Sequence, residues 1–154
     1  MREVKILNYV YLPYLCTMIY ITRRERFNAA HKLYREDWTL EENERVFGNC
    51  SNPNWHGHNY DLFVTVKGHI NPETGFLIDL KRMKDIIIQE VIDKLDHKNV
   101  NLDVDFMNGK MASTEVIAVE IFNILKPFFD QENVILHAVR LHETENNYVE
   151  YFGE

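Results

Sequence analysis

The stretch HGHNYDLFVTVK, residues 56–67, carries the clearest structural signal in this chain of 154 residues. From residue 59 onward the side chains alternate with a period of two, which is typical of a half-buried antiparallel strand. One side is formed by Tyr60, Leu62, Val64 and Val66, and the other by Asp61, Phe63, Thr65 and Lys67. Side chains two positions apart on a strand point to the same face, so His56 and His58 should lie together.

Further strands are predicted on both sides of this stretch. Upstream, residues 18–27 (MIYITRRERF) read as a first strand. Downstream, residues 136–143 and 148–152 should pair as a hairpin joined by the turn residues 144–147.

Two amphipathic helices are predicted between these strands. Asp79 can cap the first, from Leu80 to about Leu95, and Ser113 or Thr114 can cap the second. The second should run to about residue 128, where Pro127 helps to end it. Their apolar stripes are Leu80, Met83, Ile87 and Val91 in the first helix, and Ile117, Ile121, Leu125 and Phe128 in the second.

The resulting order, strand, strand, helix, helix, strand, strand, indicates an α+β fold in which the helices cover one sheet face. No repeat, low-complexity tract or linker divides residues 18–154, so we expect a single domain there. The other sheet face would leave Phe63 or its neighbours exposed, which favours association of subunits.

Composition limits the class of protein. The chain is 45% hydrophobic and 27% charged, which excludes disordered and collagen-like classes, and its net charge of −7 argues against nonspecific nucleic-acid binding. The chain has only two cysteines, Cys16 and Cys50, which lie far apart in the sequence, so we do not expect a disulfide framework. We expect instead a reducing compartment, the cytoplasm.

Residues 1–17 are expected to be an N-terminal extension without chemistry. The apolar stretch at residues 9–16 is short, contains Pro13 and lacks a small-x-small cleavage pattern, so a secretory signal is disfavoured. We predict no membrane segment and no nucleic-acid partner.

The strongest functional signal is a set of three histidines, His31, His56 and His58. Three neutral imidazoles would leave one position of a tetrahedral zinc ion open, which is the arrangement of catalytic sites. A His-x-His pair alone is also compatible with two histidines on a polar strand face.

Cys50 lies in the turn-rich stretch GNCSNPNW, residues 48–55, which reads as an irregular loop. Beside a metal dication or an imidazolium the pKa of its thiol should fall, making it a base or nucleophile. The alternative is a buried, inert thiol.

Two acidic positions complete the candidate site. Asp96 could orient His97 for proton transfer, although an Asp-His pair at a helix end also serves as a surface cap. Glu143 could accept two parallel hydrogen bonds from an aminopyrimidinone edge, and the alternative is an exposed hairpin acid.

These residues resemble a known family, that of 6-pyruvoyl tetrahydropterin synthase and its bacterial relative, 6-carboxytetrahydropterin synthase of queuosine biosynthesis. The resemblance covers residues 20–154 through five ordered motifs, FNAAH (27–31), CSNPNWHGHNY (50–60), LDHKN (95–99), STE (113–115) and ETENN (143–147).

The resemblance implies a T-fold, an antiparallel four-stranded sheet backed by two helices, with three subunits closing a barrel and two trimers forming a homohexamer. It implies Zn²⁺ on His31, His56 and His58. The implied catalytic residues are Cys50, Asp96 and His97, and the implied substrate-binding residues are Glu143 and Thr114.

The implied substrate is 7,8-dihydroneopterin triphosphate, which loses triphosphate by elimination. The product is 6-pyruvoyl-tetrahydropterin in one branch and 6-carboxytetrahydropterin plus acetaldehyde in the other. The five residues between Cys50 and His56 look more like the biopterin-type loop. A non-catalytic zinc or pterin-binding module is the alternative of another class. The phosphates could meet one of five basic residues, and the sequence does not choose among them: Arg23, Arg24, Arg26, Lys32 and Arg35.

Overall fold

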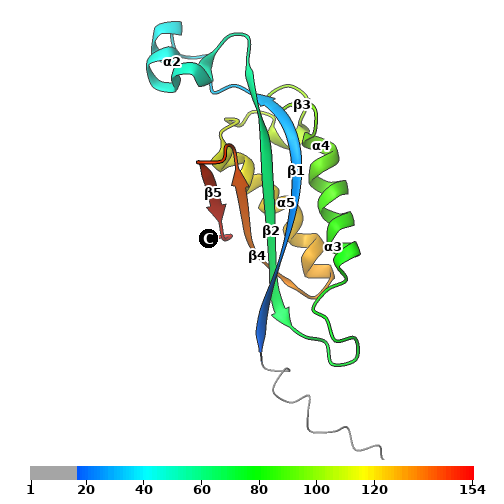
Figure 1. Ribbon diagram of the computed structural model, residues 1–154. Coiled ribbons are helices and arrows are strands. Elements are labelled where there is room, and N and C mark those ends of the chain that lie inside the picture. Colours follow the sequence, from blue (N-terminus) through cyan, green and yellow to red (C-terminus); the bar gives the residue numbers. More distant parts are fainter. Residues whose placement is uncertain (1–16) are drawn as a thin grey trace, which may run out of the picture.

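The computed structural model describes residues 17–154 (Figure 1). The expected extension therefore lies outside the described residues, except for Thr17. The elements are, in chain order, β1 (Met18–His31), α2 (Leu40–Phe47), the 3₁₀ turn η2 (Gly48–Ser51), β2 (His56–His69), α3 (Leu80–Ile87), the π-helical turn η3 (Ile88–Ile92), α4 (Asp93–Leu95), β3 (Lys98–Asn99), the 3₁₀ turn η4 (Asp105–Met107), α5 (Thr114–Gln131), β4 (Ile135–His142) and β5 (Tyr148–Tyr151). Within this part of the chain, no helix combines the length and the apolar character that crossing a membrane requires.

The strands form one sheet in the order β3-β1-β2-β4-β5. The predicted four antiparallel strands are present, but the sheet is mixed and five-stranded because β3 runs parallel to β1. Two backbone bonds flank the β3 pairing, from His97 N–H to Asn28 O (2.6 Å) and from Val100 N–H to Ala30 O (2.8 Å). A two-residue strand is too short to show a period of two, so the sequence did not predict it.

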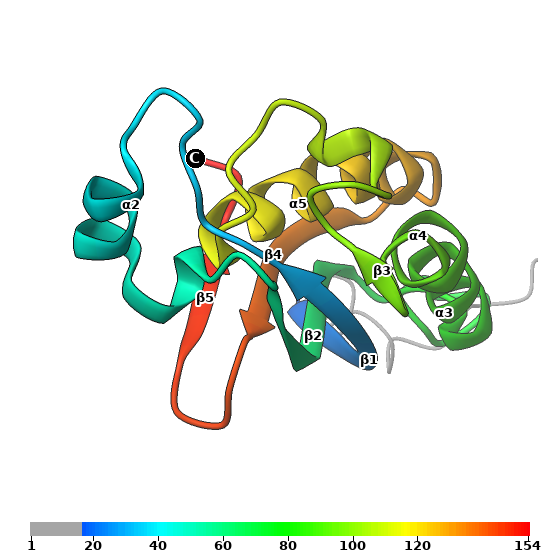
Figure 2. The same ribbon diagram turned by 90° about the horizontal axis from the view of Figure 1, so that it is seen from above.

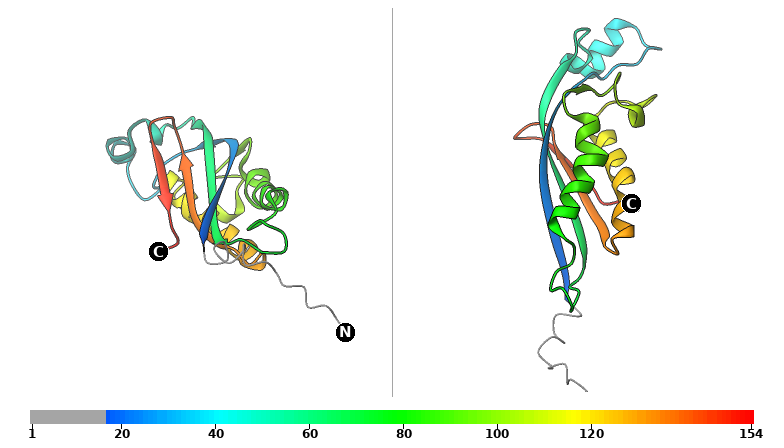
Figure 3. Two further views of the ribbon diagram at one scale, coloured as in Figure 1. Left: turned by 60° about the horizontal axis from the view of Figure 1, so that its bottom comes forward. Right: turned by 90° about the vertical axis from the view of Figure 1, so that its right-hand side faces the viewer.

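The helices α3, α4 and α5 lie against one face of the sheet (Figures 2 and 3). The predicted inner residues of β2 are fully buried in this layer: Tyr60, Leu62, Val64 and Val66. On the opposite face Phe63 is half-buried, because the guanidinium of Arg24 lies over its ring and the ring of His142 packs beside it. Among residues 17–154, no helix or strand covers that face (Figures 2 and 3).

The first predicted helix is confirmed from Leu80 to Leu95, with Asp79 as its cap, whose Oδ1 accepts from the N–H of Lys81 at 2.7 Å. Its middle is the π-helical turn η3, which inserts an extra residue and rotates the buried face. Leu80, which the sequence placed on the apolar stripe, is instead 56% exposed.

The second predicted helix is α5, and its cap is Ser113, whose Oγ accepts from Val116 N–H. Pro127 does not end this helix, which continues to Gln131. Because proline has no N–H, the backbone carbonyl of Asn123, four positions earlier, loses its helical hydrogen bond. Pro127 and Asn123 are both exposed, so water can donate to this carbonyl instead.

The sequence prediction missed α2. Thr39 Oγ1 accepts from the N–H of Glu42 at 3.1 Å, and the pattern Thr-x-x-Glu is the signal that could have revealed this helix. Buried Asn43 fixes the preceding loop, because its side chain accepts from Arg35 N–H (2.8 Å) and donates to Arg35 O (2.9 Å). Thus α2 leads into η2, which carries Cys50.

Candidate active site

The pairing of β1 with β2 assembles the three histidines. His31, the last residue of β1, is directly opposite His56, the first residue of β2, and His58 follows two positions later on the same face. One ligand atom from each ring can be chosen so that all lie within 4.8 Å of one another. The three predicted metal ligands therefore come together.

A close backbone approach beside the histidines requires Gly57. A Cβ at this position would lie 2.9 Å from the carbonyl oxygen of Ala29 on the paired strand. The absence of a side chain therefore allows β1 and β2 to keep this register at the cluster.

The histidine cluster has the donor set that a metal ion needs. His31 Nδ1 lies 2.7 Å from the carbonyl oxygen of Ala112, which can only accept, so Nδ1 carries the proton and Nε2 has the lone pair. His31 Nε2, His56 Nδ1 and His58 Nε2 are buried without a hydrogen-bond partner. Burial lowers the pKa of all three imidazoles, which favours the neutral, metal-binding form.

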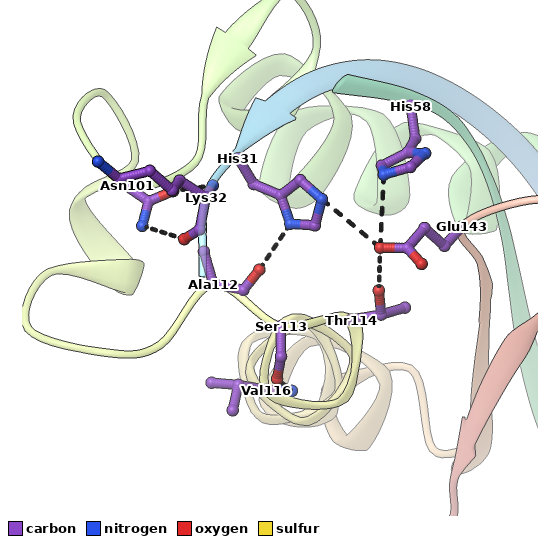
Figure 4. A network of polar contacts seen from close by, with 9 residues as sticks. All are labelled: His31, Lys32, His58, Asn101, Ala112, Ser113, Thr114, Val116 and Glu143. Atoms are coloured by element: carbon purple, nitrogen blue, oxygen red, sulfur yellow. Dashed lines mark hydrogen bonds and ion pairs between the residues drawn. The ribbon is translucent and has the colours of Figure 1, made fainter. Parts of the chain in front are cut away.

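Glu143 lies against this cluster, at the end of β4 (Figure 4). Its Oε1 is 3.5 Å from His31 Nε2 and 3.6 Å from His58 Nε2, and it accepts a hydrogen bond of 2.9 Å from Thr114 Oγ1. Glu143 is thus part of the site rather than an exposed hairpin acid. Thr114, at the first position of α5, holds its carboxylate in place.

Cys50 faces the same group of residues from η2. It is a free, half-buried thiol, and it lines a cavity of about 270 Å³ together with His31, Thr114 and Glu143. Burial, followed by the charge of Glu143, raises the pKa of the thiol. The sequence predicted a lowered pKa for this thiol, because it assumed a metal ion or an imidazolium beside it. The protein groups alone do not supply that positive charge, so the pKa rises instead.

Asp96 and His97 form the predicted pair directly after α4. Their side chains are 2.9 Å apart, and Asp96 Oδ1 also accepts from Asn28 N–H at 2.8 Å, the main reason why the pKa of Asp96 is lowered. The His97 side chain is 82% exposed. Asp96 lines a different cavity from Cys50, one of about 620 Å³ that also includes Glu143. A single chain therefore does not bring the pair into the cavity of Cys50.

Tyr60 adjoins the histidine cluster, although the sequence pattern placed it only on one side of the strand and gave it no role in the site. It continues the series His56, His58 along β2, its ring packs edge-on against those of His31 and His58, and its buried hydroxyl has no hydrogen-bond partner. The period of two that grouped the histidines was the available signal.

Comparisons with known proteins point to one family. The family model described as 6-pyruvoyl tetrahydropterin synthase matches residues 20–154. The chain is 42% identical to the 6-pyruvoyl tetrahydrobiopterin synthase of Pongo abelii over 134 residues, covering 87% of this chain and 91% of that protein. It is 25% identical to the 6-carboxy-5,6,7,8-tetrahydropterin synthase of Rickettsia bellii, over 86% of this chain and 99% of that protein. The structure of Caenorhabditis elegans 6-pyruvoyl tetrahydropterin synthase superposes with a TM-score of 0.83 at 33% identity, covering 90% of this chain and 97% of that one.

Proposed function

Because this chain belongs to the 6-pyruvoyl tetrahydropterin synthase family, whose members are lyases of pterin biosynthesis, we propose that it eliminates triphosphate from 7,8-dihydroneopterin triphosphate in a zinc-dependent reaction. One observation carries the proposal. Three buried histidine nitrogens without a hydrogen-bond partner, a thiol and a carboxylate adjoin one another where β1, β2, η2 and β4 meet.

His31, His56 and His58 would hold the zinc ion. A zinc ion bound there would act as a Lewis acid on the hydroxyl groups of the substrate side chain, which makes the adjoining carbon-bound protons more acidic. The lowered pKa of the three imidazoles supports this assignment, because desolvation favours the neutral ring, which can bind a metal, over the imidazolium ion.

Cys50 would take the carbon-bound proton, because its thiol lines the cavity that His31 and Glu143 also line. Asp96 would orient His97 through the contact with His97 Nδ1, leaving the other ring nitrogen to transfer protons at the substrate side chain. Since this pair lies outside the cavity of Cys50 in one chain, we place complete active sites between subunits.

Glu143 would anchor the pterin ring, with Thr114 as a second substrate-binding residue. The contacts of Glu143 to Thr114 and to the histidines use Oε1, so Oε2 can accept from the amino edge of the ring. The hydroxyl of Thr114 holds the carboxylate in place by its bond to Oε1.

The proposed assembly is a homohexamer of two trimers whose sheets close a barrel. The uncovered sheet face, with exposed Tyr20, Tyr148 and Phe152, supports subunit contacts there. We further infer a cytoplasmic location from the free thiol of Cys50.

Of the two branches, we favour formation of 6-pyruvoyl-tetrahydropterin. The identity to the Pongo abelii synthase is 42%, against 25% to the Rickettsia bellii carboxy-type enzyme. The five residues between Cys50 and His56 support the same choice.

The test is to incubate zinc-loaded protein with 7,8-dihydroneopterin triphosphate and to measure released triphosphate, the pterin product and acetaldehyde. Triphosphate with a 6-pyruvoyl product supports the proposal, whereas acetaldehyde with a 6-carboxy product assigns the queuosine branch. Cys50→Ala should keep its zinc and its assembly but lose triphosphate release. Unchanged turnover in that variant would refute the role of Cys50, and no turnover in the wild type would favour a non-catalytic zinc or pterin-binding module.

A further inference from the structure

A substrate with a triphosphate chain needs a cation near the site, and the sequence offered five. Four of them are already paired with carboxylates in the structure. Arg23 pairs with Glu25 at 2.6 Å, and Arg35 pairs with Asp37 at 2.6 Å. Arg24 and Arg26 both bind Asp61, each at 2.8 Å.

Lys32 is different, because among residues 17–154 its ammonium has no carboxylate partner. Its Nζ lies 4.4 Å from the centre of the Tyr34 ring and 5.0 Å from that of the Trp55 ring. Cation–π contacts hold an ammonium in place without neutralising its charge. The cation therefore stays available to an anion.

The backbone fixes Lys32 beside the site. The side chain of Asn101 accepts from Lys32 N–H at 2.9 Å and donates to Lys32 O at 3.0 Å. Lys32 directly follows His31, and Trp55, under its ammonium, directly precedes His56. The N–H of Leu33 donates to Cys50 O at 2.8 Å, which ties the same segment to the loop of the thiol.

The cavities that Lys32 and Arg26 line differ in the number of carboxylates. Arg26 lines the larger cavity together with four carboxylates, which would repel a triphosphate: Asp61, Asp96, Glu143 and Glu145. Lys32 lines a cavity of about 380 Å³ that has a single carboxylate, Glu44, and five uncharged side chains with hydrogen-bonding groups: Tyr34, Asn43, Asn49, Ser51 and Asn52. An anion is therefore better accommodated on the side of Lys32.

We propose that the ammonium of Lys32 binds the phosphate chain of the substrate, beside the loop that carries Cys50. This inference rests on the proposed function, since it assigns one part of the same substrate. The lysine contributes a compact point charge, and the side-chain amides of Asn49 and Asn52, which line the same cavity, can donate further hydrogen bonds to phosphate oxygens.

The experiment compares Lys32→Gln, Lys32→Arg and a matched control, Lys84→Gln, which removes the same charge from an exposed position of α3. In the zinc-loaded full chain, Lys32→Gln should raise the KM for 7,8-dihydroneopterin triphosphate, and the Ki of inorganic triphosphate, by about tenfold or more. Lys32→Arg should restore most of both values, and Lys84→Gln should match the wild type. Zinc content and circular dichroism check that each variant is folded.

An unchanged Ki in Lys32→Gln, or an equal rise in Lys84→Gln, would overturn the assignment of Lys32. Failure of the proposed function gives a different result, namely a wild-type protein that shows no turnover. In that case calorimetry with inorganic triphosphate tests the role of Lys32 directly. The proposal requires that the wild type bind triphosphate more tightly than Lys32→Gln does.

Discussion

Replacing Gly57 by alanine should damage the metal site without changing any of its ligands. The new Cβ would lie 2.9 Å from Ala29 O and 3.4 Å from Ala30 Cα, both of which are backbone atoms of the paired strand. Backbone cannot rotate away as a flexible side chain can, so β1 and β2 must separate where His31 faces His56. Overpacking of this kind costs about 1–3 kcal/mol, which for a domain of this size lowers Tm by roughly 3–10 °C. We also expect zinc affinity to fall on the order of tenfold, as for changes next to metal ligands.

The assay is zinc titration against a chromophoric chelator, together with thermal unfolding of the metal-free protein. Gly68→Ala is the matched control, because it lies on the same strand and the three atoms nearest to its Cβ would all belong to the Leu77 side chain, with Cδ1 at 2.6 Å. Leu77 can change rotamer, so this variant should bind zinc like the wild type. If Gly57→Ala keeps wild-type zinc affinity and Tm, the close approach of the strands does not position the histidines and the reasoning is wrong.

Two further predictions concern the same cluster. Burial lowers the pKa of His31, His56 and His58 from 6.5 in the folded protein. Just below pH 6.5 the unfolded chain therefore binds more protons than the folded one, and the metal-free protein should lose stability as the pH falls below about 6.5. Urea unfolding at several pH values measures this, and a stability that is flat or rises on acidification would contradict it. Thr114→Val should lower the free energy of unfolding by about 1 kcal/mol, because Glu143 Oε1 loses a buried donor, while Thr114→Ser should retain most of it. Equal stabilities of the valine and serine variants would show that the bond to Glu143 contributes nothing.

The local chemistry of the chain predicted much of the framework. Alternation in β2 and the carboxylate of Asp79 are signals within a few residues, and both are confirmed. The two residues of β3 and the continuation of α5 through Pro127 depend on tertiary contacts and solvent exposure, for which the local sequence has no signal. The helix α2 was predictable from Thr39 and Glu42, since its cap is local.

The site shows the same division. The grouping of His56 with His58 follows from strand geometry, whereas the approach of His31 depends on the register of two distant segments. The bond from Thr114 to Glu143 joins residues 29 positions apart, and no local pattern indicates it. The pKa of Cys50 depends on burial and on the charge of Glu143, both of which are set by the fold.

The pairing of His31 with His56 also links metal binding to the alignment of β1 and β2 during folding. The connection between β1 and β2, residues 32–55, is long, so no tight turn sets which residues of the two strands face each other. A slip by one position would turn the side chains of one strand to the opposite face and separate His31 from His56 and His58. A metal ion bound by all three histidines would thus select the correctly aligned hairpin, and metal uptake during refolding would report that the two longest strands have found their native alignment.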